Sequence, residues 1–175
     1  DLNWTSTGGT FVAGSGSVAF VGAGAQSITG ATSFYNLTLS KPTNNLTLNS
    51  AVTVTNVLTL TTGNLITTTA NLLSLPTAAT ISGGSASSYI SGPVQKVQAG
   101  ATTVTYPLGS VAASRYRPAT IANTTSATTW RVEYVGGNPT TDGYPNSTIN
   151  TTNIRTVSQF EYWNINRISG AATAD

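Results

Sequence analysis

The chain has 175 residues, enough for one domain or two small ones. Charged residues make up 7% of the sequence, where about 25% is typical, and the net charge is +2. Because proteins that read nucleic acids carry basic patches, this charge argues against nucleic-acid binding. The sequence holds no Cys and no His, which excludes a disulfide framework, a thiolate metal site and the usual His-dependent triads.

The abundant uncharged polar residues do not indicate disorder, because Thr, Val and Ile alternate in a pattern typical of β-strands. No apolar run reaches the roughly 18 residues that a membrane-spanning helix needs, so we expect no membrane span. The sequence has no Met, even at position 1. We therefore expect either a chain matured by removal of a signal peptide or a piece of a longer protein.

Residues 1–34 consist of short apolar segments separated by glycine pairs and Gly-Ser steps, such as Gly8-Gly9. This spacing predicts short strands with turns between them. The segments that we expect to face a core are Phe11-Val12, Val18-Ala19-Phe20-Val21 and Ser27-Ile28-Thr29.

Residues 35–98 repeat a phrase in which Asn is followed by aliphatic residues alternating with Thr. The copies begin at Asn36, Asn45, Asn56, Asn64 and Asn71. They predict strands near 36–40, 45–49, 52–55, 57–61, 64–68 and 71–75. A phrase this short cannot bury its own apolar face, so its copies must stack on one another as in a solenoid.

The spacing of matching phrases sets the expected geometry of the repeat. Residues 37–39 match 58–60 and residues 46–48 match 65–67, so the copies lie 19–21 residues apart. The short turns would also suit antiparallel hairpins, but this spacing fits three-sided rungs stacked about 4.8 Å apart. We therefore predict an all-β fold with a β-helix-like solenoid over residues 1–98, with leucines stacked inside and asparagines stacked at the corners.

The sequence changes character after the repeats, where charged residues become frequent from Lys96 onward. Longer segments alternate cleanly between apolar and polar residues, and these are 103–107, 116–121, 128–135 and 156–165. In the third of them, Trp130, Val132 and Tyr134 share one face. We predict an antiparallel β-sandwich-like region over residues 99–175, cut short at its C-terminal end, and no helix in the chain.

Several motifs are familiar from one class of proteins. They are the segment from Asn3 to Gly30, Phe34-Tyr-Asn-Leu-Thr-Leu39, Ser91-Gly-Pro-Val94, Val104-Thr-Tyr-Pro-Leu-Gly109, Tyr116-Arg-Pro118 and Glu161-Tyr-Trp-Asn-Ile165. With them the chain resembles, along nearly its whole length, the repetitive β-rich surface and adhesin-like proteins of Bacteroidota. The resemblance implies export, often by a type IX secretion route, and a structural or adhesive role outside the cell.

Three internal acidic residues are candidates for chemistry: Glu133, Asp142 and Glu161. Paired carboxylates can hydrolyse glycosides. However, Glu133 and Glu161 fall on predicted strands, and the nearby Arg131 and Arg167 favour cross-strand ion pairs over catalysis.

Asp142 lies in a turn-rich segment together with Asn138 and Asn146. These three side chains offer the oxygen ligands that Ca²⁺ prefers, but an ordinary loop with Asx-turns is the favoured interpretation. We therefore predict no catalytic, cofactor-binding or metal-binding residues, and the sequence leaves any ligand-binding residues unknown.

Four aromatic residues, Trp130, Tyr134, Tyr162 and Trp163, are candidates for a platform that stacks sugars. The alternation places Trp130 and Tyr134 on one face, which favours packing in a core. The basic segment 115–117 has the composition of an anion grip, but we interpret it as a device that protects a strand edge.

These observations lead to one functional hypothesis. We expect a non-enzymatic extracellular protein, a segment or subunit of a bacterial cell-surface adhesin, fibre or matrix assembly, whose partners are further copies or segments of the same chain. The alternative is a carbohydrate-binding accessory module of a secreted protein, with surface glycans as partners. A β-helix enzyme that degrades polysaccharides is disfavoured, because residues 36–92 carry a single charged residue.

Overall fold

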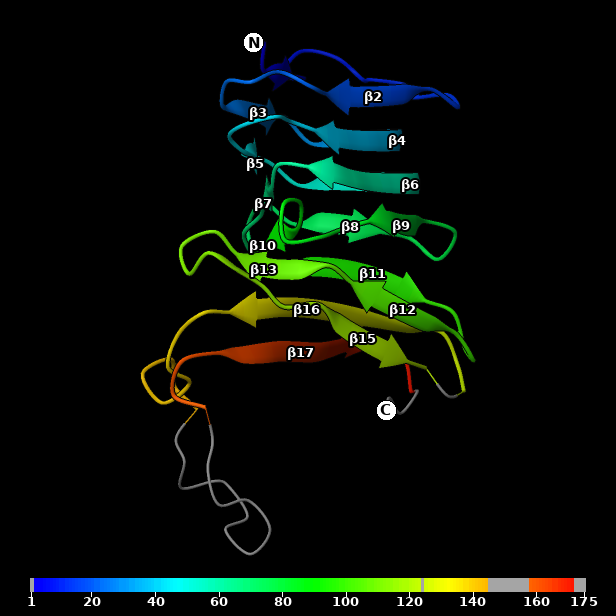
Figure 1. The fold of residues 1–175 in the computed structure, drawn as a ribbon. Coiled ribbons are helices and arrows are strands. Elements are labelled where there is room, and N and C mark those ends of the chain that lie inside the picture. The colour runs from blue at the N-terminus through cyan, green and yellow to red at the C-terminus, as the bar shows by residue number, and fades with distance from the viewer. Residues whose placement is uncertain (1, 124, 145–157, 172–175) are drawn as a thin grey trace, which may run out of the picture.

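The computed structural model describes residues 2–123, 125–144 and 158–171. Within these ranges the chain forms strands and connecting turns, with no helix. The strands stack into a β-solenoid of about five turns, with β1 and β2 at one end and β17 at the other (Figure 1). The predicted solenoid and the predicted lack of helices are therefore confirmed for the described residues.

Two long sheets run along the stack. The first has seven strands, in the order β1 (Trp4–Thr5), β3 (Gln26–Thr29), β5 (Leu46–Leu48), β7 (Leu65–Ile66), β10 (Ile90–Ser91), β13 (Leu108–Ser110) and β14 (Arg115–Tyr116). The second has eight, namely β2 (Ser17–Phe20), β4 (Thr32–Ser40), β6 (Val52–Thr62), β8 (Leu73–Leu75), β9 (Thr80–Gly83), β11 (Val94–Gln98), β16 (Thr128–Val135) and β17 (Tyr162–Ser169). A third, short sheet pairs β12 (Thr103–Tyr106) with β15 (Ala119–Ala122).

Strands β4 and β6 turn a corner, so that each contributes two sides of a rung. The first part of β6 pairs with β8 through Val52 and Leu73, whereas its second part pairs with β9 through Val57 and Thr80. The register between β4 and β6 shifts at the same corner, after Phe34. Together with the first sheet, these two sides give the three-sided rung that the repeat length predicts. The strands expected separately at 52–55 and 57–61 are one bent strand.

The register of the parallel strands matches the repeat in the sequence. Leu37 lies opposite Leu58 and Leu46 opposite Leu65, which are the predicted spacings of 21 and 19 residues. These four leucines are at most 1% exposed, and burial of each contributes about 1.5–3 kcal/mol. The predicted leucine ladder is therefore confirmed.

Asparagine side chains link neighbouring rungs, as predicted. Asn56 Nδ2 donates to Asn36 Oδ1 at 2.8 Å, and Asn36 Nδ2 donates to Ser17 Oγ at 3.0 Å. On the first sheet, Asn64 Oδ1 accepts a hydrogen bond from the backbone N–H of Tyr89 at 3.1 Å. Each such bond contributes about 0.5–1.5 kcal/mol and also favours the correct register.

A buried lysine holds one rung corner from the inside. Lys41 is 0% exposed, and its Nζ donates to the carbonyl oxygens of Gly22 and Gly24 and to Gln26 Oε1 at 2.6–2.8 Å. Burial lowers the pKa of the Lys41 ammonium, and the three acceptors offset part of the cost of burying its charge. In the sequence Lys41 is an isolated charged residue, and nothing there predicts that its side chain is buried and binds backbone carbonyl groups.

The N-terminal rung is less enclosed than the sequence predicts. Phe20 and Ile28 are buried as expected, but Val12 and Val21 are 81% and 61% exposed. Val21 directly follows β2, whose alternation points Phe20 inward and hence its neighbour outward. The expectation that both valines face the core is wrong.

A separate β-sandwich over residues 99–175 is not confirmed. Antiparallel strands do follow the repeats, but β16 pairs with β11 and β17 pairs with β16, so they extend the second sheet of the solenoid. The inward residues Trp130, Val132 and Tyr134 belong to the same core as the leucine ladder. Any strand with one buried face shows this alternation, so the sequence does not distinguish the two arrangements. The domain division at residue 98 stays a prediction.

One bent hairpin carries the chain from β12 to β15. Strand β12 pairs with β15, and β13 with β14, in one continuous antiparallel register that brings Pro107 opposite Pro118 at the bend. The half of the hairpin formed by β12 and β15 lies beyond β9, yet neither strand is paired with β9. The last strand, β17, begins at Tyr162, later than the predicted segment 156–165, of which residues 156–157 lie outside the described ranges.

Candidate functional site

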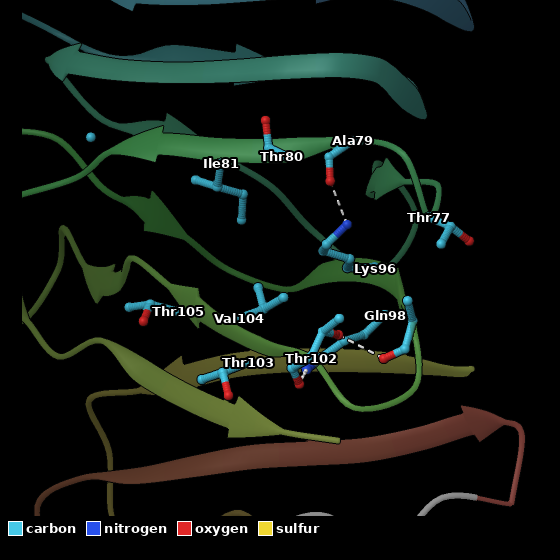
Figure 2. A pocket seen from close by; sticks show the side chains of 12 residues that line it. Thr77, Ala79, Thr80, Ile81, Lys96, Gln98, Thr102, Thr103, Val104 and Thr105 are labelled. Carbon is cyan, nitrogen blue, oxygen red and sulfur yellow. Dashed lines mark hydrogen bonds between the residues drawn. The ribbon is translucent and has the colours of Figure 1, made fainter. Parts of the chain in front are cut away.

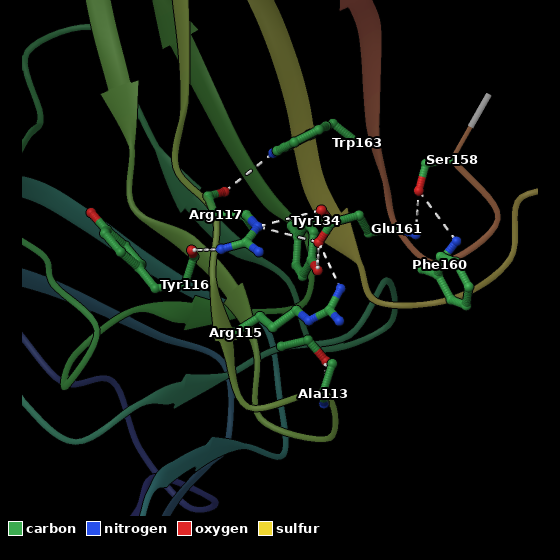
Figure 3. A network of polar contacts seen from close by, with 10 residues as sticks. Ala113, Arg115, Tyr116, Arg117, Tyr134, Ser158, Phe160, Glu161 and Trp163 are labelled. Atoms are coloured by element: carbon green, nitrogen blue, oxygen red, sulfur yellow. Dashed lines mark hydrogen bonds and ion pairs between the residues drawn. The ribbon is translucent and has the colours of Figure 1, made fainter. Parts of the chain in front are cut away.

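A cluster of polar side chains surrounds Glu161, directly before β17 (Figure 3). Glu161 Oε2 lies 3.0 Å from Arg115 Nη1 and 3.2 Å from Arg117 Nε, and it accepts a 2.6 Å hydrogen bond from Tyr134 Oη. The two arginines come from the hairpin around β14 and the tyrosine from β16. The cluster therefore ties three elements together at one end of the solenoid.

This environment keeps the Glu161 carboxylate ionised. The hydrogen bond from Tyr134, assisted by the bonds and charges of Arg115 and Arg117, lowers the pKa of Glu161 below its usual value. A general acid in a glycosidase needs the opposite, a carboxyl group with a raised pKa. The arrangement thus suits a structural ion pair rather than proton transfer.

The partners of Glu161 differ from the predicted ones. An ion pair was the correct expectation for this residue, but pairing with Arg131 or Arg167 is wrong, because the hairpin brings in Arg115 and Arg117 instead. These two arginines lie more than 40 residues away in sequence, so no local pattern encodes their approach.

Glu133 also departs from the predicted cross-strand ion pair. It lies opposite Asn164 on the neighbouring strand β17, and burial raises the pKa of its carboxyl group. Arg131, which the sequence offers as its neighbour, donates from Nη2 to Gln95 Oε1 at 3.0 Å.

Polar side chains of the loop after β16 form hydrogen bonds within the loop and to β17. Asn138 Oδ1 accepts from the backbone N–H of Thr140 at 3.0 Å, which is an Asx-turn. Asp142 Oδ2 accepts from Tyr162 Oη at 3.1 Å, and burial followed by this bond raises the pKa of Tyr162 to about 12. Asn146 lies outside the described residues. Within the part of the chain that the structure describes, no group of three or more acidic side chains gathers to hold a metal ion.

The four candidate aromatic residues do not form one platform. Trp130 is 7% and Tyr134 2% exposed, so both belong to the core as predicted, and Trp130 Nε1 donates to Asn123 Oδ1 at 2.8 Å. Trp163 is 41% exposed and lies against Tyr134, with ring centroids 5.7 Å apart. Its indole N–H donates to the carbonyl oxygen of Arg117 at 3.1 Å. Of the four, Trp163 is the one whose side chain is exposed.

A cavity of about 360 Å³ opens between β9 and β12 (Figure 2). We call it the β9–β12 groove. Lys96 lies at its base, 4% exposed, and its Nζ donates to the carbonyl oxygens of Pro76 at 3.2 Å and Ala79 at 2.5 Å. Burial lowers the pKa of this ammonium.

A fully buried glutamine supports the other side of the groove. Gln98 Nε2 donates to the carbonyl oxygens of Thr102 and Ile121 at 2.7 and 2.8 Å, and Gln98 Oε1 accepts from Tyr106 Oη at 3.3 Å. This side chain fixes the wide turn between β11 and β12. The sequence predicts no site here, because the groove arises from the separation of two strands and not from a motif.

Both ends of the solenoid present strand edges. Among the described strands, β1 and β2 at one end and β14, β15 and β17 at the other each have a neighbour on one side alone. Large exposed apolar side chains lie close to these edges, namely Leu2, Val12 and Val21 near the first end and Phe160, Trp163, Ile165 and Ile168 near the second. Exposed edges with apolar side chains are typical of surfaces that associate.

Comparison with known proteins found no relative of this chain. No protein-family model, curated protein or solved structure matches this chain. In the described ranges, no helix has the length and apolar character needed to cross a bilayer.

Proposed function

We propose that this protein is an extracellular structural or adhesive component, a segment or subunit of a bacterial cell-surface adhesin, fibre or matrix assembly. The observation that supports this proposal most is the open-ended solenoid, in which both ends offer strand edges beside exposed apolar side chains. Partners in this proposal are further copies or segments of the same chain, together with surface glycans.

The N-terminal edge lacks the features that usually prevent association. Natural proteins protect exposed edge strands with charged side chains, proline or bulges. Residues 2–40, which include β1 and β2, hold no Asp, Glu, Lys, Arg or Pro. An edge of this kind pairs readily with another strand, as an assembling protein requires.

The inside of the solenoid suits a load-bearing role. Backbone ladders, the leucine ladder and the bonds of Asn36 and Asn56 join each rung to the next. Each rung is therefore held to the next by many bonds at once, which opposes its detachment under load. The resemblance to Bacteroidota surface proteins supports the same extracellular, adhesive interpretation.

Sedimentation velocity over a range of protein concentrations tests the proposal. We expect the native chain to form larger species as its concentration rises. Ile165→Lys places a charge on the core-facing side of β17, opposite Val132, and should reduce association. Thr59→Lys places the same charge on the outer side of the central strand β6 and should leave association unchanged. Monomers at all concentrations, or equal effects of the two variants, would contradict the proposal.

A carbohydrate-binding module remains the second candidate, on the strength of one observation. Trp163 is 41% exposed beside Tyr134, and a large, partly exposed aromatic side chain is a candidate contact for a sugar ring. Co-sedimentation with insoluble cellulose, chitin and xylan tests this function. Binding that Trp163→Ala abolishes would support it, and absence of binding to all three would count against it.

A further inference from the structure

Two buried lysines hold similar corners of the solenoid, but their ammonium groups are not equally bonded. Each donates to a carbonyl oxygen 17 residues earlier in the chain. Lys41 Nζ has three acceptors at 2.6–2.8 Å, one for each of its N–H groups. Lys96 Nζ has two among the described residues, the carbonyl oxygens of Pro76 and Ala79. One N–H of Lys96 is therefore left for an acceptor that the described residues do not supply.

Lys96 lines the β9–β12 groove, the cavity of about 360 Å³ described above (Figure 2). Its side chain is 4% exposed, and it is the one charged residue of the lining. Among the described residues, the ion pairs involve Glu161 and not Lys96. Because a buried ammonium without a counter-ion is costly, the groove favours a ligand that carries one negative charge.

One end of the groove is closed, which limits the size of the ligand. Gly84 follows β9 and lies against Pro107, since a Cβ at Gly84 would be 2.4 Å from Pro107 Cβ. Strands β9 and β12 have four residues each and span roughly 13 Å. The volume is at the small end for ligand pockets, which hold about 300–1,000 Å³. The groove therefore suits one or two sugar rings, or a molecule of that size, and not a long chain that runs through it.

The backbone of β9 offers hydrogen-bonding groups to such a ligand. The N–H of Gly84 donates to the carbonyl oxygen of Leu60 on β6 at 3.1 Å. N–H and C=O groups alternate in direction along a parallel strand, so those of Ile81 point away from β6. The carbonyl oxygen of Ala79 follows the same pattern, because it accepts from Lys96.

The backbone of β12 offers the same groups from the opposite rim. The N–H of Asn123 donates to the carbonyl oxygen of Thr102 at 2.8 Å, which identifies a hydrogen-bonded antiparallel pair. Thr103 and Thr105 are one and three residues further along β12, at positions that lie between hydrogen-bonded pairs. Their N–H and C=O groups therefore point away from β15.

The side chains of the lining suit a ligand with many hydroxyl groups. Ile81 and Val104 are partly buried against the core and supply an apolar surface, such as the C–H groups of a sugar ring can cover. Five residues of the lining carry hydroxyl groups, namely Thr77, Thr80, Thr102, Thr103 and Thr105.

The same lining argues against other small anions. Phosphate groups are usually held by arginine forks or several cations, whereas Lys96 is alone. A free amino acid needs a carboxylate for its ammonium group, and the lining holds no Asp or Glu. A fatty acid would cover the backbone groups of both rims without forming hydrogen bonds to them, which is costly.

We propose that the β9–β12 groove binds a hexuronic acid, a sugar that carries a carboxylate. The carboxylate accepts from the remaining N–H of Lys96, the hydroxyl groups bond to the two rims, and the ring lies over Ile81 and Val104. This inference rests on the glycan partners of the proposed function, for which it names the class of sugar and the site. It does not depend on association at the solenoid ends.

Titration of the native protein with glucuronic acid, followed in ¹H–¹⁵N correlation spectra, tests the inference. We expect saturable shifts of the backbone amide signals of Ile81, Thr103 and Thr105. The dissociation constant should be about 1 mM, as for a ligand of about a dozen non-hydrogen atoms. Glucose lacks the carboxylate and propionate lacks the hydroxyl groups, so each should bind at least about tenfold more weakly.

Lys96→Met and Lys41→Met form a matched pair of variants. Each removes a buried ammonium group, but only Lys96 lines the groove. Lys96→Met should weaken binding of glucuronic acid at least about tenfold, and Lys41→Met should leave it unchanged. If either variant fails to fold by circular dichroism, Thr103→Glu and Thr120→Glu repeat the test at exposed positions of one hairpin. Thr103→Glu places a repelling carboxylate in the lining and should weaken binding, whereas Thr120→Glu lies outside it.

Three outcomes would overturn the inference. They are no saturable shifts with glucuronic acid, equal affinity for glucuronic acid and either glucose or propionate, and equal effects of the two members of a variant pair. Sedimentation of the same samples separates this inference from the proposed association. A chain that associates but does not bind glucuronic acid overturns the groove assignment alone. A chain that binds glucuronic acid but stays monomeric supports the groove assignment and contradicts the association alone.

Discussion

Replacement of Leu58 by Ala tests the stacked interior of the solenoid. Leu58 is 0% exposed and lies in register between Leu37 on one rung and Ile81 on the next. Because neighbouring rungs fix both sides of the site, the cavity left by the substitution cannot collapse. We therefore expect a loss at the upper end for Leu→Ala changes in protein cores, about 3–5 kcal/mol.

Thr59→Ala is the matched control for this substitution. Thr59 is the next residue on the same strand and points outward, so its replacement should cost less than about 1 kcal/mol. Urea unfolding, followed by far-ultraviolet circular dichroism and by tryptophan fluorescence, gives both free energies if the two signals coincide. A loss below about 1 kcal/mol for Leu58→Ala, or equal losses for both variants, would refute the inward ladder.

Three further predictions concern the bonds between rungs and elements. Asn56→Ala removes the hydrogen bond to Asn36 and should cost about 0.5–1.5 kcal/mol in urea unfolding, more than Thr59→Ala on the outer side of the same strand; equal costs would count against the asparagine ladder. Gly92 has φ +113°, and a Cβ there would lie 2.2 Å from the carbonyl oxygen of Thr67. Gly92→Ala should therefore lower the melting temperature markedly, with about 1–3 kcal/mol from backbone strain alone, whereas Gly8→Ala, with open space around it, should not; unchanged melting of both would contradict this contact. Because the folded state lowers the pKa of Glu161 from its usual 4.5, the stabilisation from its ionised form is complete above that pH and is lost as the pH falls below it. The native chain should thus be more stable than Glu161→Gln at pH 7 and lose that advantage in acid, and a difference that does not change with pH would contradict the ion-pair cluster.

The part of the fold that the sequence predicts best is the part that repeats. Leu37 and Leu58 occur in the same phrase, so identical side chains occupy equivalent places on successive rungs, and their pairing follows from the spacing alone. Asn36 and Asn56 pair for the same reason. In a solenoid, each repeat contacts the next repeat through equivalent residues, so the repeat length in the sequence predicts which residues meet.

Contacts made once in the fold are not encoded in this way. Glu161 contacts Arg115 because a bent hairpin returns to the edge of β17. No repeat in the sequence predicts this contact. The β9–β12 groove likewise depends on where one hairpin lies relative to β9. The alternation in β16 correctly predicts a buried Trp130 but not which sheet the strand joins.

Electron microscopy of the native protein, without tags, tests the central proposal most directly. The first sheet stacks seven strands from β1 to β14, so each copy joined end to end should add about 34 Å at 4.8 Å per strand. We expect fibres with this axial repeat, and we expect Ile165→Lys to shorten or abolish them. Isolated particles of single-chain size at all concentrations would contradict the proposal that the solenoid ends join copies of this chain.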